Sequence, residues 1–240
     1  MLGVANGYGA PDPACQDGPE VLRALRFPSD LEETRNSFHW DEPIRNRHPA
    51  ARDTLAAVED IAGQLADRAG THVQEGSFPL VIGGDHSCAI GTWAGVKRAL
   101  GAEARLGLVW IDAHMDSHTF DSSPSKQIHG MPLACLFGVG DPRLTGIAGV
   151  GAKLLPQDVC LIGVRSFESE EASLLKRLAT ASTSWTKSGS GDCMRSLSKR
   201  WLWSANTQPA TVSASISTPL IPLRNRASEA PSREACYAPT

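Results

Sequence analysis

Apolar runs and stretches with helical spacing alternate along the first 178 residues. The apolar runs are short, as is typical of buried strands, and they occur at residues 2–5, 78–82, 106–111 and 158–164. Segments with the spacing or the end signals of helices lie between and after them. Strands that alternate with helices predict an α/β domain built around a parallel sheet.

The clearest helix is predicted between Pro49 and Gly70. Four apolar residues recur there on one helical face: Leu55, Val58, Ile61 and Leu65. Further helices are predicted from Asp17, from the residues after Ser87 to about Leu100, at residues 130–137 and at residues 168–178. Residues 26–48 show no clear period, so we expect a loop there.

The stretch Asp112-Ala-His-Met-Asp116 directly follows the apolar run 106–111. Alternation along an extended segment would place Asp112, His114 and Asp116 on one face. Parallel sheets bind ligands at the carboxyl ends of their strands, and two carboxylates with an imidazole suit a divalent cation. We therefore predict a metal site here. The alternative is a polar loop that caps the next helix.

A second polar stretch, Gly83-Gly84-Asp85-His86-Ser87, follows the apolar run 78–82 and so also lies at the carboxyl end of a predicted strand. Its glycines permit a tight turn and a close approach of the backbone. We expect His86 to join the same metal site, although a histidine in such a loop can instead simply form hydrogen bonds. Two carboxylates and two imidazoles, without a thiolate, favour manganese over structural zinc.

Composition narrows the class of protein. The chain has 240 residues, 41% of them hydrophobic, which is enough for one sizeable domain. A net charge of -3 without a basic block argues against nucleic acid or an anionic membrane as partner. We see no membrane span or signal sequence. The six cysteines lack CxxC spacing, and Cys88, Cys135 and Cys160 are expected to be buried thiols in a cytoplasmic protein.

The motifs GGDHS and DAHMD, their spacing and the opening GAPDPACQDGPEVLR resemble the arginase/agmatinase (ureohydrolase) family over roughly residues 1–178. The resemblance implies a three-layer α-β-α fold with a parallel sheet and hydrolysis of a guanidino compound at two manganese ions. L-arginine would then give L-ornithine and urea. By the same resemblance, His86, Asp112 and Asp116 hold one manganese ion, and His114 holds the other with Asp112 shared.

Residues 117–130 are more similar to arginases than to agmatinases. His129 matches the histidine that passes a proton to the leaving amine, with a surface loop histidine as the alternative. His118 and Ser125 match positions at which arginases contact the amino-acid end of the substrate. His118 replaces an expected Asn, and Lys126-Gln127 replaces Gly-Asn. An agmatinase or formiminoglutamase activity therefore stays open. The resemblance also makes a homo-oligomer possible.

The resemblance stops near residue 178. The family requires a further motif, Ser-x-Asp-x-Asp-x-x-Asp-Pro, whose first two Asp complete both metal shells, and this chain lacks it. Ser and Thr account for 19 of the residues 179–240, and Asp192, Glu229 and Glu234 are the only acidic ones. Neither a helical nor a strand period is sustained. We expect residues 1–178 to form an incomplete domain, and residues 179–240 to be a poorly ordered tail.

The genetic code offers an explanation for this change. When the reading frame is shifted by one base, the codons for Ser184–Ser188 permit Met-Asp-Glu-Val. In the same shifted frame, the codons for Thr211–Pro222 permit Gly-Val-Ser-Ile-Asp-Leu-Asp-Ala-Val-Asp-Pro. Codons for Pro231–Cys236 permit Val-Pro-Gly-Gly-Val. We predict that a one-base frameshift near Ala179 replaced the family's C-terminal part.

Such a replacement would leave the C-terminal strands missing or disordered and the second manganese site incomplete. Little or no arginase activity is then expected from this chain. A different class of function is also open, namely a non-catalytic metal-binding or partner-binding protein. A metal-dependent deacetylase is a weaker alternative, because that family shares the general fold but not GGDHS followed by DAHMD.

Overall fold

The computed structural model describes residues 1–25, 38–49, 53–178 and 211–216, the last of these by backbone only. Its strands are β1 (Leu2–Val4), β2 (Val81–Gly83), β3 (Leu106–Ile111), β4 (Val159–Ile162) and β5 (Thr211–Ile216). β1 pairs with β2, and β3 lies between β4 and β5. Every one of these pairings is parallel, as the alternating pattern predicted. The predicted α/β class is confirmed.

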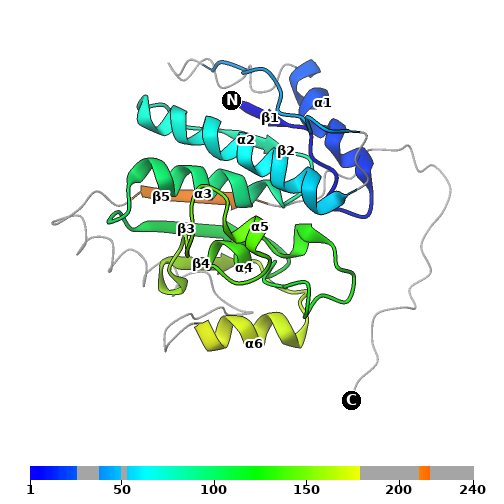
Figure 1. The fold of residues 1–240 in the computed structure, drawn as a ribbon, viewed down its shortest axis with the longest axis vertical. Coiled ribbons are helices and arrows are strands. Elements are labelled where there is room, and N and C mark those ends of the chain that lie inside the picture. Colours follow the sequence, from blue (N-terminus) through cyan, green and yellow to red (C-terminus); the bar gives the residue numbers. More distant parts are fainter. Residues whose placement is uncertain (26–37, 50–52, 179–210, 217–240) are drawn as a thin grey trace.

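In the described part of the chain, six α-helices join and cover the strands (Figure 1). They are α1 (Gly18–Ala24), α2 (Thr54–Gln74), α3 (Cys88–Leu100), α4 (Pro132–Leu136), α5 (Pro142–Thr145) and α6 (Ser169–Leu178). One side of α3 packs on the sheet, where Trp93 joins a core with Leu108 of β3. Its other side packs on α2, where Ile90 meets Val58. α3 is therefore buried along most of its length, and its first residues are held firmly at the sheet.

The helix predicted between Pro49 and Gly70 is α2, but both predicted ends are wrong. It begins at Thr54, where the Asp53 side chain accepts a hydrogen bond from the Ala56 N–H as an N-cap. It continues through Gly70, which is fully buried against α3. A Cβ atom at Gly70 would lie 3.2 Å from the Gly95 carbonyl oxygen. This glycine permits close helix packing and does not end the helix.

The predicted strand at residues 78–82 is shorter and shifted. β2 comprises only Val81–Gly83, and Phe78 is 76% exposed. Pro79 has no N–H to donate to a neighbouring strand, which limits how early the pairing can begin. Pairing starts where the Leu2 N–H donates to the Leu80 carbonyl oxygen at 2.9 Å. The turn that carries His86 still follows the strand's carboxyl end.

β5 lies within the segment expected to be a poorly ordered tail. Its register places Leu106 opposite Thr211 and Ile111 opposite Ile216, so both strands end at the same level. Residues 211–216 therefore form a strand, and the expectation of a poorly ordered tail over residues 179–240 stays a prediction. An open edge of β3 offers backbone donors and acceptors to any extended segment, whatever its side-chain pattern. The rest of the predicted tail lies outside the described residues.

The buried cysteines and the lengths of the helices bear on two further predictions. Cys88 and Cys135 are free and buried, as predicted. Cys160 is likewise buried in β4, as predicted, and it is disulfide-bonded. Among the described residues, no helix has the length and apolar character needed to cross a bilayer.

Candidate metal centre

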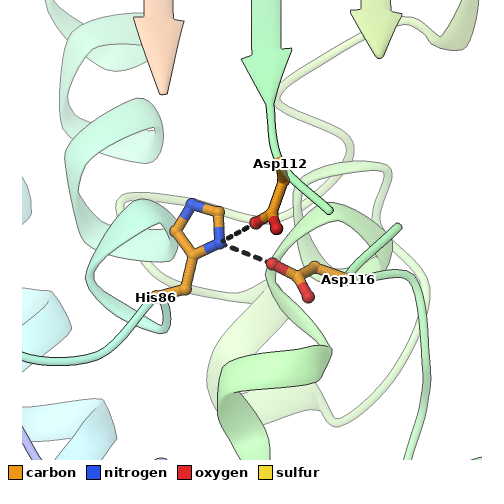
Figure 2. A group of neighbouring side chains, drawn as sticks. All are labelled: His86, Asp112 and Asp116. Carbon is orange, nitrogen blue, oxygen red and sulfur yellow. Dashed lines mark hydrogen bonds and ion pairs between the residues drawn. The ribbon is translucent and has the colours of Figure 1, made fainter. Parts of the chain in front are cut away.

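Three side chains converge below the carboxyl ends of β3, β4 and β5 (Figure 2). His86 comes from the turn between β2 and α3, Asp112 directly follows β3, and Asp116 comes four residues later. His86 Nδ1 lies 2.5 Å from Asp116 Oδ2 and 3.0 Å from Asp112 Oδ2. The three side chains are 9%, 6% and 1% exposed, in the order His86, Asp116 and Asp112. We call them the His86 group.

The carboxylates do not meet through strand alternation. β3 ends at Ile111, and the chain then turns, with Asp116 in the left-handed region at a φ of 46°. The Asp116 carbonyl oxygen accepts a hydrogen bond from the Leu133 N–H at 2.8 Å, which ties this turn to α4. A non-glycine residue held in this conformation stores strain, and such residues cluster at functional sites.

Each member of the His86 group changes the ionisation of the others. Burial alone would lower the pKa of His86, but hydrogen bonds and the charges of Asp112 and Asp116 raise it to about 9. Burial raises the pKa of Asp116, and its hydrogen bond with His86 offsets this only in part. For Asp112, burial is outweighed by hydrogen bonds with His86 and the His114 N–H, so its pKa is lowered. The group therefore concentrates negative charge around one imidazole.

The donor atoms fit a divalent cation. A histidine Nδ1 carries at most one hydrogen, yet here it faces two carboxylate oxygens. Asp112 Oδ2 is buried, and among the described residues its polar partner is His86 Nδ1 at 3.0 Å. One nitrogen and two carboxylate oxygens within 4.8 Å of one another form a donor set that a divalent metal can bind. The ring of buried Trp110 supports His86 at 4.4 Å between centroids, a contact that no sequence motif indicated.

His114 does not join the His86 group. Its side chain is 56% exposed, and its Nδ1 lies 3.2 Å from Asp112 Oδ1, the oxygen that faces away from His86. The His114 N–H also donates to this oxygen at 3.0 Å. Asp112 therefore lies between two histidines and presents one oxygen to each.

His129 lies in a short 3₁₀ turn, Ile128–Gly130, and its N–H donates to the Gly9 carbonyl oxygen at 3.0 Å. Its charge is one of the influences on the neighbouring Asp85, whose pKa burial raises. Ser125 lies on an exposed turn, where its hydroxyl accepts a hydrogen bond from the Gln127 N–H at 3.3 Å. Neither residue belongs to the His86 group.

His118 belongs to a second cluster, together with Glu168 and Glu171 of the α6 region. Its Nε2 lies 3.0 Å from Glu168 Oε2 and 3.5 Å from Glu171 Oε2, and its Nδ1 lies 3.1 Å from the Ser122 hydroxyl. Hydrogen bonding to His118 lowers the pKa of Glu168, whereas burial raises that of Glu171. Both ring nitrogens of His118 thus have partners within the chain.

Sequence reasoning missed both glutamates of this cluster. The available signal was their spacing of three residues at the start of a predicted helix, which places them on one side of its first turn. Acidic residues are common at that position because they complement the helix dipole. The spacing alone therefore did not distinguish a cluster from an ordinary helix start.

Comparison with known proteins identifies relatives of this chain. The chain matches the model of the Arginase family over residues 1–216. It is 49% identical over 188 residues to an arginase of Bacillus caldovelox, covering 73% of this chain and 60% of that protein. An arginase of Entamoeba histolytica is 36% identical over 176 residues, with coverages of 71% and 58%.

The structure also superposes on a solved arginase from Bacillus subtilis, with a TM-score of 0.67 and 33% sequence identity. The superposition covers 74% of this chain and 59% of the Bacillus subtilis chain. The chain thus spans about three fifths of the length of these relatives. The matched region includes both metal motifs and ends at the last residue of β5. The chain belongs to the Arginase family.

Proposed function

We propose that this chain carries the first part of a manganese-dependent hydrolase of guanidino compounds, with L-arginine as the substrate and L-ornithine and urea as products. The observation that carries the proposal is the His86 group, a buried donor set at the carboxyl end of a parallel sheet. Membership of the Arginase family supports the reaction class. Manganese is favoured because two of the three donors are carboxylate oxygens.

In this proposal, His86, Asp112 and Asp116 hold one cation, and His114 with the second oxygen of Asp112 contributes to another. Divalent cations at such sites lower the pKa of a water molecule and stabilise the developing negative charge. The burial of Asp112 and Asp116 excludes competing water from these carboxylates. His129 is assigned the transfer of a proton to the leaving amine, a role that an imidazole can fill.

We further propose that activity is impaired because the second site lacks its remaining carboxylates. β5 ends beside Asp112, yet its sequence, Thr-Val-Ser-Ala-Ser-Ile, contains no acidic residue. In the shifted reading frame, the two required Asp codons straddle Ser215–Ile216 and Ser217–Thr218, at the end of this strand. A frameshift near Ala179 accounts for the loss. Sequencing the coding DNA tests this directly, and a shifted frame with a stop or without the Asp pair would contradict it.

Manganese titration of the purified chain, followed by assay of urea release, tests the proposed function. We expect one Mn²⁺ to bind at the His86 group and urea release from arginine far below that of a full-length relative. An absence of Mn²⁺ binding would contradict the assigned metal site, and urea release equal to the relative's would contradict the impairment. A frame-corrected protein compared on arginine and agmatine would separate arginase from agmatinase, since only arginine has a carboxylate for Ser125 to contact.

A non-catalytic metal-binding protein is the second candidate. The exposed position of His114 favours it, because among the described residues the second metal position has only His114 and one oxygen of Asp112. Mn²⁺ binding with measurable urea release would favour the impaired enzyme, and Mn²⁺ binding without any urea release would favour this alternative.

A further inference from the structure

The Asp85 carboxylate joins two segments that are far apart in the sequence. Its Oδ2 accepts a hydrogen bond from the Gly9 N–H at 2.9 Å. Its Oδ1 accepts two more, from the Ser87 N–H at 2.8 Å and from the Ser87 hydroxyl at 2.5 Å. One oxygen therefore holds the N-terminal loop, while the other holds the turn in which His86 lies.

Gly9 extends this connection to His129. The Gly9 carbonyl oxygen accepts the His129 N–H at 3.0 Å, so the same peptide segment contacts Asp85 on one side and the His129 turn on the other. A Cβ atom at Gly9 would lie 2.9 Å from both Asp85 Oδ1 and the Ser87 hydroxyl. Only glycine permits so close an approach without a shift of these side chains.

Further hydrogen bonds make the contact rigid. The Asp85 N–H donates to the Asn6 carbonyl oxygen at 2.9 Å, and Asn6 Nδ2 donates to the Ser87 hydroxyl at 2.7 Å. Asn6 and Ser87 are both almost completely buried. The N-terminal loop and the turn before α3 are thus held together by several bonds, with the Asp85 carboxylate at their centre.

We propose that Asp85 is a positioning residue that fixes the His129 turn relative to the His86 group through Gly9. The proposal rests on the proposed function for the roles of His86 and His129. Nothing in the geometry requires Asp85 to touch a substrate. Its contribution is to hold a proton-transferring histidine and a metal-ligating histidine, which come from different segments, at a constant separation.

Asp85→Asn is the sharpest test, because an amide keeps the shape but has only one acceptor oxygen. It cannot accept from both the Gly9 N–H and the Ser87 N–H. We expect amide hydrogen exchange at Gly9 and at His129 to become about ten-fold faster or more. Exchange at Leu108, in the centre of β3, should stay as in the wild type. Unchanged exchange at His129, or an equal increase at Leu108, would overturn the proposal.

Ser87→Ala is the matched control, because it removes only the hydroxyl contacts and leaves the bond between Asp85 Oδ2 and Gly9. His129 exchange should not change in this variant. If Asp85→Asn does not fold, Gly9→Ala provides a second test, since its Cβ would push against Asp85. It should also accelerate exchange at His129 and not at Leu108.

The separation between His129 and the His86 group can be followed with Co²⁺ as a paramagnetic probe. In the wild type, Co²⁺ at the His86 group should shift the NMR resonances of the His129 ring relative to a Zn²⁺-loaded sample. Asp85→Asn should change that shift while Ser87→Ala preserves it; the same shift in Asp85→Asn would overturn the proposal. If Co²⁺ and Zn²⁺ fail to bind the wild type, the metal assignment fails, whereas the exchange measurements still decide the role of Asp85.

Discussion

Asp112 presents its two carboxylate oxygens to two different histidines: Oδ2 lies 3.0 Å from His86 Nδ1, and Oδ1 lies 3.2 Å from His114 Nδ1. The two histidines differ in environment, because the His86 side chain is 9% exposed and that of His114 is 56% exposed. A cation bound by the buried side of Asp112 would therefore be shielded from water, while one on the other side would meet solvent.

This difference predicts unequal effects of two substitutions on Mn²⁺ binding. Asp112→Asn should weaken binding at the His86 group by about ten-fold or more, because a charged ligand is lost from a buried site. His114→Ala should change it by less than about three-fold, because removing this side chain leaves all three ligands of the group in place. Calorimetric titration measures both. Equal losses in the two variants would show that His114 contributes to the same site.

The metal-free protein should lose stability as the pH rises from 6.5 to about 9. The pKa of His86 is raised in the fold from 6.5 to about 9, so its contribution is complete below pH 6.5 and disappears above pH 9. The decrease in the free energy of unfolding is at most about 3–4 kcal/mol. Urea denaturation across this range measures it. His86→Gln should flatten the profile, and a steep decrease that persists in that variant would contradict the prediction.

Close packing of α2 on α3 predicts a large effect of a single methyl group at Gly95. A Cβ there would lie 2.2 Å from the Ala66 carbonyl oxygen, so the helices must separate. Gly95→Ala should lower the free energy of unfolding by about 1–3 kcal/mol. Gly63→Ala is the control, since no atom lies within 4 Å of a Cβ at that helical position. It should stabilise the protein by about 0.5–1 kcal/mol. Thermal or urea denaturation of both variants measures these changes. Similar changes in the free energy of unfolding of Gly95→Ala and Gly63→Ala would refute the packing argument.

His118 should contribute to the stability of the fold because its imidazole lies beside the buried carboxyl group of Glu171. The side chains of both residues are under 10% exposed, and His118 Nε2 lies 3.5 Å from Glu171 Oε2. His118→Ala should lower the free energy of unfolding by about 1–3 kcal/mol, since Glu171 would lose its imidazole partner. Glu170→Gln, on an exposed neighbour, should change it by less than about 0.5 kcal/mol. An unaltered urea midpoint in His118→Ala would contradict this expectation.

Within residues 1–178, the sequence by itself determined the order of strands and helices and the places where polar residues for chemistry lie. Apolar runs at residues 106–111 and 158–164 indicated β3 and β4 because both faces of a parallel strand are buried. Polar residues after two such runs indicated Asp112, Asp116 and His86 as neighbours, because parallel strands end at the same edge. These inferences needed only the period of the pattern and the order of the elements.

Only the tertiary structure decided how those side chains face one another. The turn at Asp116 leaves His114 outside the His86 group, and α6 places two glutamates against His118. Gly70 became an interior helix residue because α3 packs against it, and residues 211–216 became a strand because β3 offered an open edge. Each of these outcomes depends on contacts between segments distant in the sequence, which local periodicity does not encode.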